Sequence, residues 1–125
     1  MKGEESGAAR DLRVRTKEFS LRIIRMYSAL PKTAVAQVLG KQVLRAGTSV
    51  GAKLREAQRG RSRAEFISKV GDCLKELDET AYWLELLSDS GAMKPGKLKA
   101  HRGECEELLS ILTAISKKSK ARGKL

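Results

Sequence analysis

The feature that most limits the possible folds is the spacing of the apolar residues, which recur at steps of three and four along most of the chain. One stretch carries Leu39, Val43, Ala46, Val50, Leu54 and Ala57. Such spacing places apolar side chains on one face of an α-helix, and it is typical of the buried seam of a helical bundle. No stretch alternates apolar and polar residues with a period of two, so we expect no β-sheet.

Short breaks divide this pattern into four segments. Pro31 disfavours a helical residue before it, and Gly60 suits the end of a helix. The third break is SDSGAMKPG, which contains Gly91, Pro95 and Gly96. The expected helices cover approximately residues 10–30, 33–58, 63–89 and 97–118. Helices of similar length with short loops predict an all-α, antiparallel up-and-down four-helix bundle. We assign residues 10–118 to the bundle, 1–9 to a flexible N-terminus and 119–125 to a basic tail.

The formal net charge of +11 on 125 residues is large and favours a polyanionic partner. Nucleic acid is the first candidate, followed by anionic membrane surfaces and acidic proteins. We expect no signal peptide, because the first residues lack an apolar segment, and no apolar run approaches the roughly 20 residues that could cross a membrane. We therefore expect a cytoplasmic protein that does not act on a membrane.

Basic residues gather between positions 53 and 63, where Glu56 is the only acid. The cluster comprises Lys53, Arg55, Arg59, Arg61 and Arg63. Like charges four residues apart, as at Arg55 and Arg59, slightly destabilise a helix. Selection for stability alone would not favour them, so we predict that the cluster binds nucleic-acid phosphates. The alternative is a solvated end of the bundle, with one or two arginines paired to carboxylates of the third segment.

No aromatic residues are interleaved with the basic cluster, and aromatic content is only 4%. Stacking of unpaired bases on aromatic side chains is therefore not expected. Contacts with the phosphate backbone, or with the shape of a structured RNA, fit this composition better. This composition leaves both RNA and DNA open as the ligand.

Three glycines, Gly40, Gly47 and Gly51, share one face of the second segment. A phosphate-binding loop would require the pattern GxxxxGK[ST] or a turn after a strand, and neither is present. The apolar seam continues through these glycines, so we predict that they allow another helix to pack closely. Gly71 is a candidate for the opposing surface.

The third segment is rich in acids. It carries Asp72, Glu76, Asp78, Glu79, Glu85 and Asp89. Glu76 and Glu79 could resemble a general acid/base pair, but we expect these acids to pair with Arg45, Lys53, arginines of the first segment or another subunit. Because no nucleophile motif or nearby histidine accompanies them, we predict a non-enzymatic protein without catalytic residues. Ser62 and Glu65 form a capping-box signal at the start of this segment.

A second apolar face is expected at the end of the third segment. Ala81, Leu84 and Leu87 continue the seam, which leaves Tyr82, Trp83 and Leu86 partly outside it. Such a face is typical of an interface, and we predict that it joins copies of the chain in a homo-oligomer. The alternative is that these residues cover neighbouring helices of the same bundle.

Cys73, Cys105 and His101 lie on the seams of the third and fourth segments. Buried cysteines behave as small apolar residues. With one histidine and no closely spaced cysteines, we expect no metal site and no cofactor.

A longer motif suggests a family. Over about residues 15–116 the chain closely resembles the bacterial four-helix bundle proteins encoded in intervening sequences of 23S ribosomal RNA genes. The most specific positions are Gln42, Arg45, Ala46, Ser49, Val50, Glu56, Arg59, Ser62, Glu65 and Phe66. Many relatives read GANYREA where this chain reads GAKLREA, so Lys53 adds a charge and Leu54 removes an aromatic group. The basic tail is not attributable to the family.

The resemblance implies an up-and-down bundle that assembles as a ring-forming homopentamer and associates with RNA. A distantly similar group comprises the accessory proteins of diversity-generating retroelements, in which a basic pentameric barrel engages a reverse transcriptase and nucleic acid. An alternative function is therefore a protein-interaction scaffold, such as an accessory subunit that holds a reverse transcriptase or a ribosome-associated factor.

Overall fold

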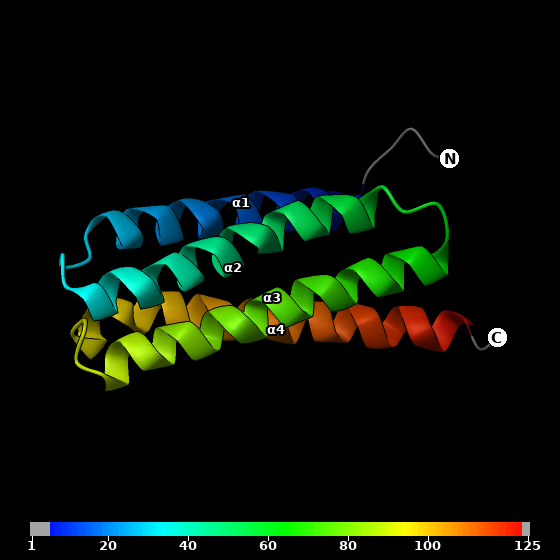
Figure 1. Ribbon diagram of the computed structural model, residues 1–125. Coiled ribbons are helices and arrows are strands. Elements are labelled where there is room, and N and C mark those ends of the chain that lie inside the picture. Colours follow the sequence, from blue (N-terminus) through cyan, green and yellow to red (C-terminus); the bar gives the residue numbers. More distant parts are fainter. Residues whose placement is uncertain (1–5, 124–125) are drawn as a thin grey trace.

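The four amphipathic segments form four antiparallel helices in a computed structural model, which describes residues 6–123 (Figure 1). They are α1 (Gly7–Ser28), α2 (Ala34–Gln58), α3 (Arg63–Asp89) and α4 (Pro95–Gly123). The described residues contain no β-strand, so the predicted up-and-down four-helix bundle is confirmed. The start of α1, the turn between α2 and α3 and the end of α4 lie at one end of the bundle.

Three of the helices have a side-chain cap at their N-terminus. The hydroxyl oxygens of Ser6, Thr33 and Ser62 accept hydrogen bonds from backbone N–H groups in the first turns of α1, α2 and α3, at 3.0, 3.2 and 3.1 Å. Each bond satisfies an N–H group that has no partner within the helix. Pro95 begins α4, where the absence of an N–H group carries no penalty.

The helices extend beyond the predicted ends of the bundle. Residues 7–9, expected to be flexible, belong to α1, and residues 119–123, expected in the tail, belong to α4. Ser6 supplies the cap for the first extension. Lys120 and Arg122 lie in the last turn of α4, where positive charge stabilises the negative end of the helix dipole. The remaining parts of both predicted terminal segments, residues 1–5 and 124–125, lie outside the described residues.

The core follows the seams expected from the sequence. Phe19, Ile23, Val50, Leu77 and Leu112 contribute to it and are almost completely buried. Helix α2 packs between α1 and α3, and α3 also packs against α4, whereas α1 and α4 approach each other closely at few positions. Arg15 of α1 bridges that gap through ion pairs with two carboxylates of α4.

The glycines of α2 allow α1 to approach closely, as predicted. A Cβ atom at Gly47 would lie 2.9 Å from Cγ1 of Ile23, and one at Gly40 would lie 2.3 Å from Cδ1 of Leu30. Gly51 packs against α1 in the same way, but less tightly. The prediction for Gly71 was wrong, because no neighbouring atom lies within 4 Å of its Cβ position.

Cys73 and Cys105 lie in the core, as predicted. Burial raises the pKa of each thiol to about 12, so both are protonated at neutral pH. Within residues 6–123, no helix has an apolar stretch long enough to cross a membrane.

The close packing of α1 and α2 leads to a prediction about Gly47. We expect Gly47→Ala to lower the free energy of unfolding by about 1 kcal/mol or more, because the added methyl group overlaps the branched side chain of Ile23. Gly103→Ala is the matched control in α4, where the methyl group would have no neighbour within 4 Å. That control should raise the free energy of unfolding by about 0.5–1 kcal/mol. Urea unfolding measures both, and equal stabilisation by the two changes would contradict the packing role.

Candidate nucleic-acid interface

Most of the predicted basic cluster lies at the connection between α2 and α3. Arg55 is in the last turn of α2, Arg59 is its C-terminal cap, and Arg63 is the first residue of α3. The side chains of Arg55, Arg59, Arg61 and Arg63 are exposed. We refer to these four arginines as the basic turn.

A capping box holds the backbone of the basic turn. The hydroxyl oxygen of Ser62 accepts the bond from the N–H group of Glu65. The Glu65 carboxylate in turn accepts a hydrogen bond from the N–H group of Arg61 at 2.9 Å. The predicted capping signal is confirmed in a variant form, because the Glu65 carboxylate bonds to the N–H group before the cap and not to that of Ser62. One of the few acids near the arginines is therefore bound to the backbone.

The arginines of the basic turn have no carboxylate partner among residues 6–123. Lys53, the remaining member of the predicted cluster, differs from them. It is half-buried, and its Nζ lies 3.8 Å from Oε2 of Glu56. Lys69 of α3 lies closer to the same carboxylate, at 3.1 Å, and its hydrogen bond lowers the pKa of Glu56. Within the predicted cluster, the positive charge without a carboxylate partner therefore lies at the turn between α2 and α3.

Two acids of α3 pair with α2 rather than forming a reactive pair. Arg45 bonds to Glu76 at 3.4 Å and to Glu79 at a shorter distance. The hydrogen bond to Glu79 raises the pKa of Arg45. The expected pairing of these acids with Arg45 is confirmed, whereas Arg15 of α1 forms its ion pairs with Glu104 and Glu107 of α4.

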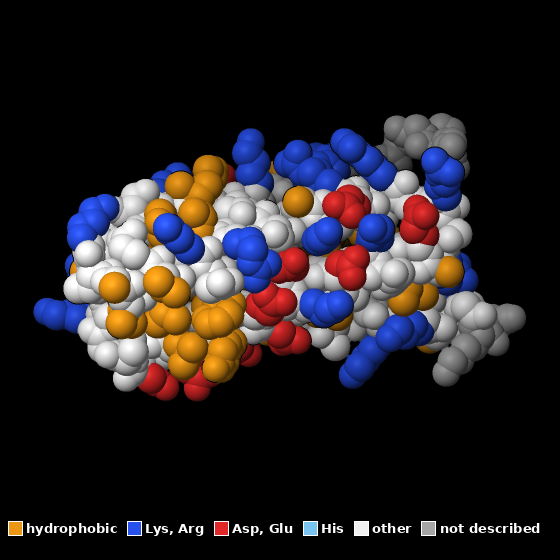
Figure 2. Space-filling model, viewed as in Figure 1, with side chains coloured by type: hydrophobic (Ala, Val, Ile, Leu, Met, Phe, Trp, Pro, Cys, Tyr) orange, Lys and Arg blue, Asp and Glu red, His pale blue; other side chains and the backbone are white. Residues whose placement is uncertain are grey.

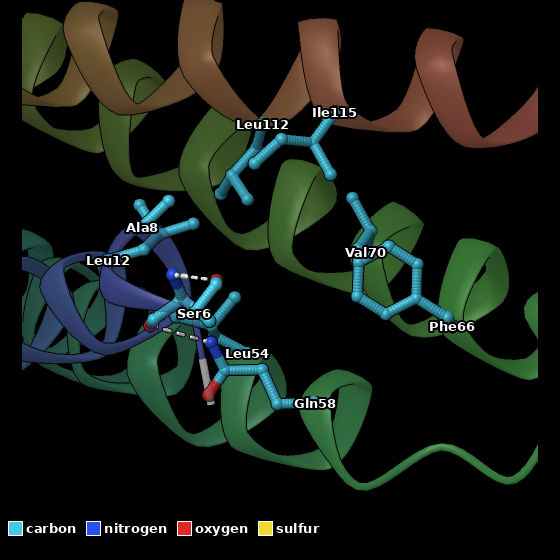
Figure 3. Close-up of a pocket in the computed structure, with 10 residues that line it drawn as sticks. Ser6, Ala8, Leu12, Leu54, Gln58, Phe66, Val70, Leu112 and Ile115 are labelled. Atoms are coloured by element: carbon cyan, nitrogen blue, oxygen red, sulfur yellow. Dashed lines mark hydrogen bonds between the residues drawn. The ribbon is translucent and has the colours of Figure 1, made fainter. Parts of the chain in front are cut away.

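A crevice of about 210 Å³ opens at the same end of the bundle (Figure 3). Leu12, Leu54, Phe66 and Leu112 come to it from all four helices, and none of the lining side chains is charged. Gln58 closes one side, because its amide nitrogen donates a hydrogen bond to the Ala9 carbonyl at 2.9 Å. Phe66, the aromatic residue nearest to the basic turn in sequence, therefore lines an apolar crevice.

The face formed by α2 and α3 carries an apolar patch at the end of the bundle opposite the basic turn. Tyr82 is 54% exposed, and Trp83 and Leu86 are half-buried, with the Tyr82 and Trp83 rings 5.2 Å apart in an edge-to-face arrangement. Because α2 runs antiparallel to α3, its first turns lie beside them, and these expose Val35 (54%) and Val38 (62%). Figure 2 shows hydrophobic side chains gathered over this part of α2 and α3. We refer to these five residues as the apolar patch.

Val35 and Val38 were not among the residues predicted for the interface. Their apolar side chains near the start of α2, next to the seam residues Ala36 and Leu39, were a signal for a second apolar face. The indole N–H group of Trp83 is also buried and has no hydrogen-bond partner within residues 6–123.

The described residues show no metal-binding arrangement. No group of three or more His, Cys, Asp and Glu residues in positions 6–123 could hold an ion. His101 is half-buried between α4 and α1, and burial lowers its pKa.

Comparison with known proteins gives a family match and a structural match. Residues 10–114 match the family described as 23S rRNA-intervening sequence protein. The structure is similar to the crystal structure of a protein of unknown function from the S23 ribosomal protein family of Bacteroides thetaiotaomicron, with a TM-score of 0.81 and 37% identity. That match covers 87% of this chain and 97% of the other. No curated protein matches the chain.

The capping box leads to a prediction about the basic turn. We expect Ser62→Ala to lower the free energy of unfolding by about 1 kcal/mol, because the N–H group of Glu65 is left without its partner. Ser68→Ala is the control, since Ser68 is exposed on the same helix. Thermal or urea unfolding compares the two, and equal effects would contradict the cap.

Proposed function

This chain belongs to the 23S rRNA-intervening sequence protein family, and from that membership and its exposed arginines we propose that it is a non-enzymatic protein that binds structured RNA through the basic turn. The observation that carries the proposal is the absence of carboxylate partners for the four arginines within residues 6–123. A guanidinium group with free donors binds phosphate oxygens in a two-pronged geometry.

The basic turn offers guanidinium groups for phosphate contacts. Phosphate contacts alone carry little sequence information, so we propose recognition of backbone and shape. RNA is favoured over DNA by the association of the family with ribosomal RNA genes. Such a protein would act in the cytoplasm.

The proposal predicts the behaviour of a triple variant, Arg59→Ala with Arg61→Ala and Arg63→Ala. We expect its affinity for 23S ribosomal RNA fragments to fall, because fewer phosphates are neutralised. The slope of log affinity against log salt should become shallower by roughly 0.9 for each phosphate of a duplex that the variant no longer neutralises. Fluorescence anisotropy over a range of salt concentrations measures both quantities.

The matched control for the triple variant removes Lys94, Lys97 and Lys99, which are exposed at the opposite end of the bundle. It lowers the net charge by the same amount and should retain most of the affinity. The proposal is wrong if the wild-type protein does not bind RNA at low salt, or if both variants bind equally weakly. Unrelated duplexes in the same assay separate shape recognition from general attraction to polyanions.

We also propose that the apolar patch joins copies of this chain in a homo-oligomer. Exposed valine side chains and a large aromatic ring favour burial, and apolar area removed from water contributes about 25 cal/mol per Å². A ring of five subunits is proposed from the family resemblance alone.

The oligomer proposal predicts that Val38→Glu shifts the protein toward monomers, because burying an unpaired carboxylate opposes association. Val14→Glu is the control, since Val14 is similarly exposed on α1, outside the patch. Analytical ultracentrifugation at micromolar concentration measures the masses. A monomeric wild-type protein would refute self-association, and co-purification of another protein with that monomer would favour the scaffold function.

A further inference from the structure

A second group of basic residues lies at the end of α4. Its exposed members are Lys117, Lys118, Lys120 and Arg122. No acid occurs between Glu107 and the end of the helix. We refer to these four residues as the α4 basic strip.

The last turn of α4, which carries Lys120 and Arg122 of the strip, lies beside the basic turn. A Cβ atom at Gly123 would be 3.6 Å from Cδ of Arg63, so the last turn of α4 contacts the first residue of α3. Figure 1 shows the same arrangement, with the end of α4 next to the start of α3. Packed helices are separated by about 8–10 Å. Two groups of like charge are therefore held next to each other, which repulsion alone would oppose.

Helix stability explains only part of the strip. Lys120 and Arg122 lie in the last turn, where they stabilise the helix dipole. Lys117 and Lys118 lie before that turn, where the effect of the dipole is weak. None of the four has a carboxylate partner within residues 6–123. Their charge is available to a ligand.

The strip is also a feature of this chain rather than of the matched family region. The family match ends at residue 114, before the first of the four residues. Binding of RNA by the strip would therefore be a property of this chain in addition to the RNA binding proposed for the basic turn.

We infer that the α4 basic strip and the basic turn form one surface that binds duplex RNA, with the strip contacting one phosphate backbone and the turn the other. This inference rests on the proposed function. A duplex presents two backbones to neighbouring basic elements, whereas a single strand held without aromatic stacking lacks a principal source of affinity. The aromatic residues of the described chain lie in the core, in the crevice, at the opposite end of α1 or in the apolar patch.

The test is a quadruple variant of the strip, K117Q/K118Q/K120Q/R122Q, in the full chain. We expect its affinity for a short RNA duplex to fall about tenfold or more, with a salt slope shallower by about 0.9 for each phosphate that is no longer neutralised. The control is K94Q/K97Q/K99Q/R102Q, which removes the same charge from exposed residues near the start of the same helix. The control should bind the duplex much more tightly than the strip variant.

Further measurements separate the possible outcomes. The double variant K117Q/K118Q, which leaves the last turn intact, should bind the duplex more weakly without a change in thermal unfolding. If the wild-type protein binds no RNA, the proposed function and this inference both fail. If the triple variant of the basic turn binds weakly but the strip variant matches its control, only this inference is overturned. Equal wild-type affinity for one strand of the duplex would overturn the choice of duplex RNA.

Discussion

The close packing of α2 against α1 is the interaction on which the rest of the structure depends. It depends most on Gly47, where a Cβ atom would overlap the branched side chain of Ile23, and at Gly40 a Cβ atom would displace the end of the Leu30 side chain. At the far end of the same contact, Gln58 bonds to the carbonyl of Ala9 and ties the last turn of α2 to the first turn of α1. The position of α2 then determines where the basic turn leaves the bundle.

The face formed by α2 and α3 changes in character along its length (Figure 2). Apolar side chains gather where α2 begins and α3 ends, and the pairs of Arg45 with Glu76 and Glu79 follow them. Beyond these pairs lies the basic turn, whose arginines have no carboxylate partner among the described residues. Ion pairs neutralise the middle of the face, so two chemically different ends remain: one suited to protein contacts and one to phosphate.

Much of the fold was predictable because helical periodicity, caps and breaks are local properties. The limits of α2 and α3 agree closely with prediction, since Thr33 and Ser62 are strong caps. The ends of α1 and α4 were less predictable, because Ser6 and Lys120 act on terminal turns that carry little apolar pattern. Within the candidate site, the arginines are exposed, as expected from the sequence. Lys53 instead lies near Glu56, a carboxylate that it shares with Lys69 of the next helix.

The sequence by itself determined the four helices, their buried seams, the packing role of the α2 glycines and the excess of positive charge. These follow from spacing along one chain, which sets the face of each helix. Only the tertiary structure placed the end of α4 beside Arg63 and the valines of α2 beside Tyr82 and Trp83. Those neighbours are far apart in sequence, so their proximity depends on how the helices pack, which no local pattern encodes.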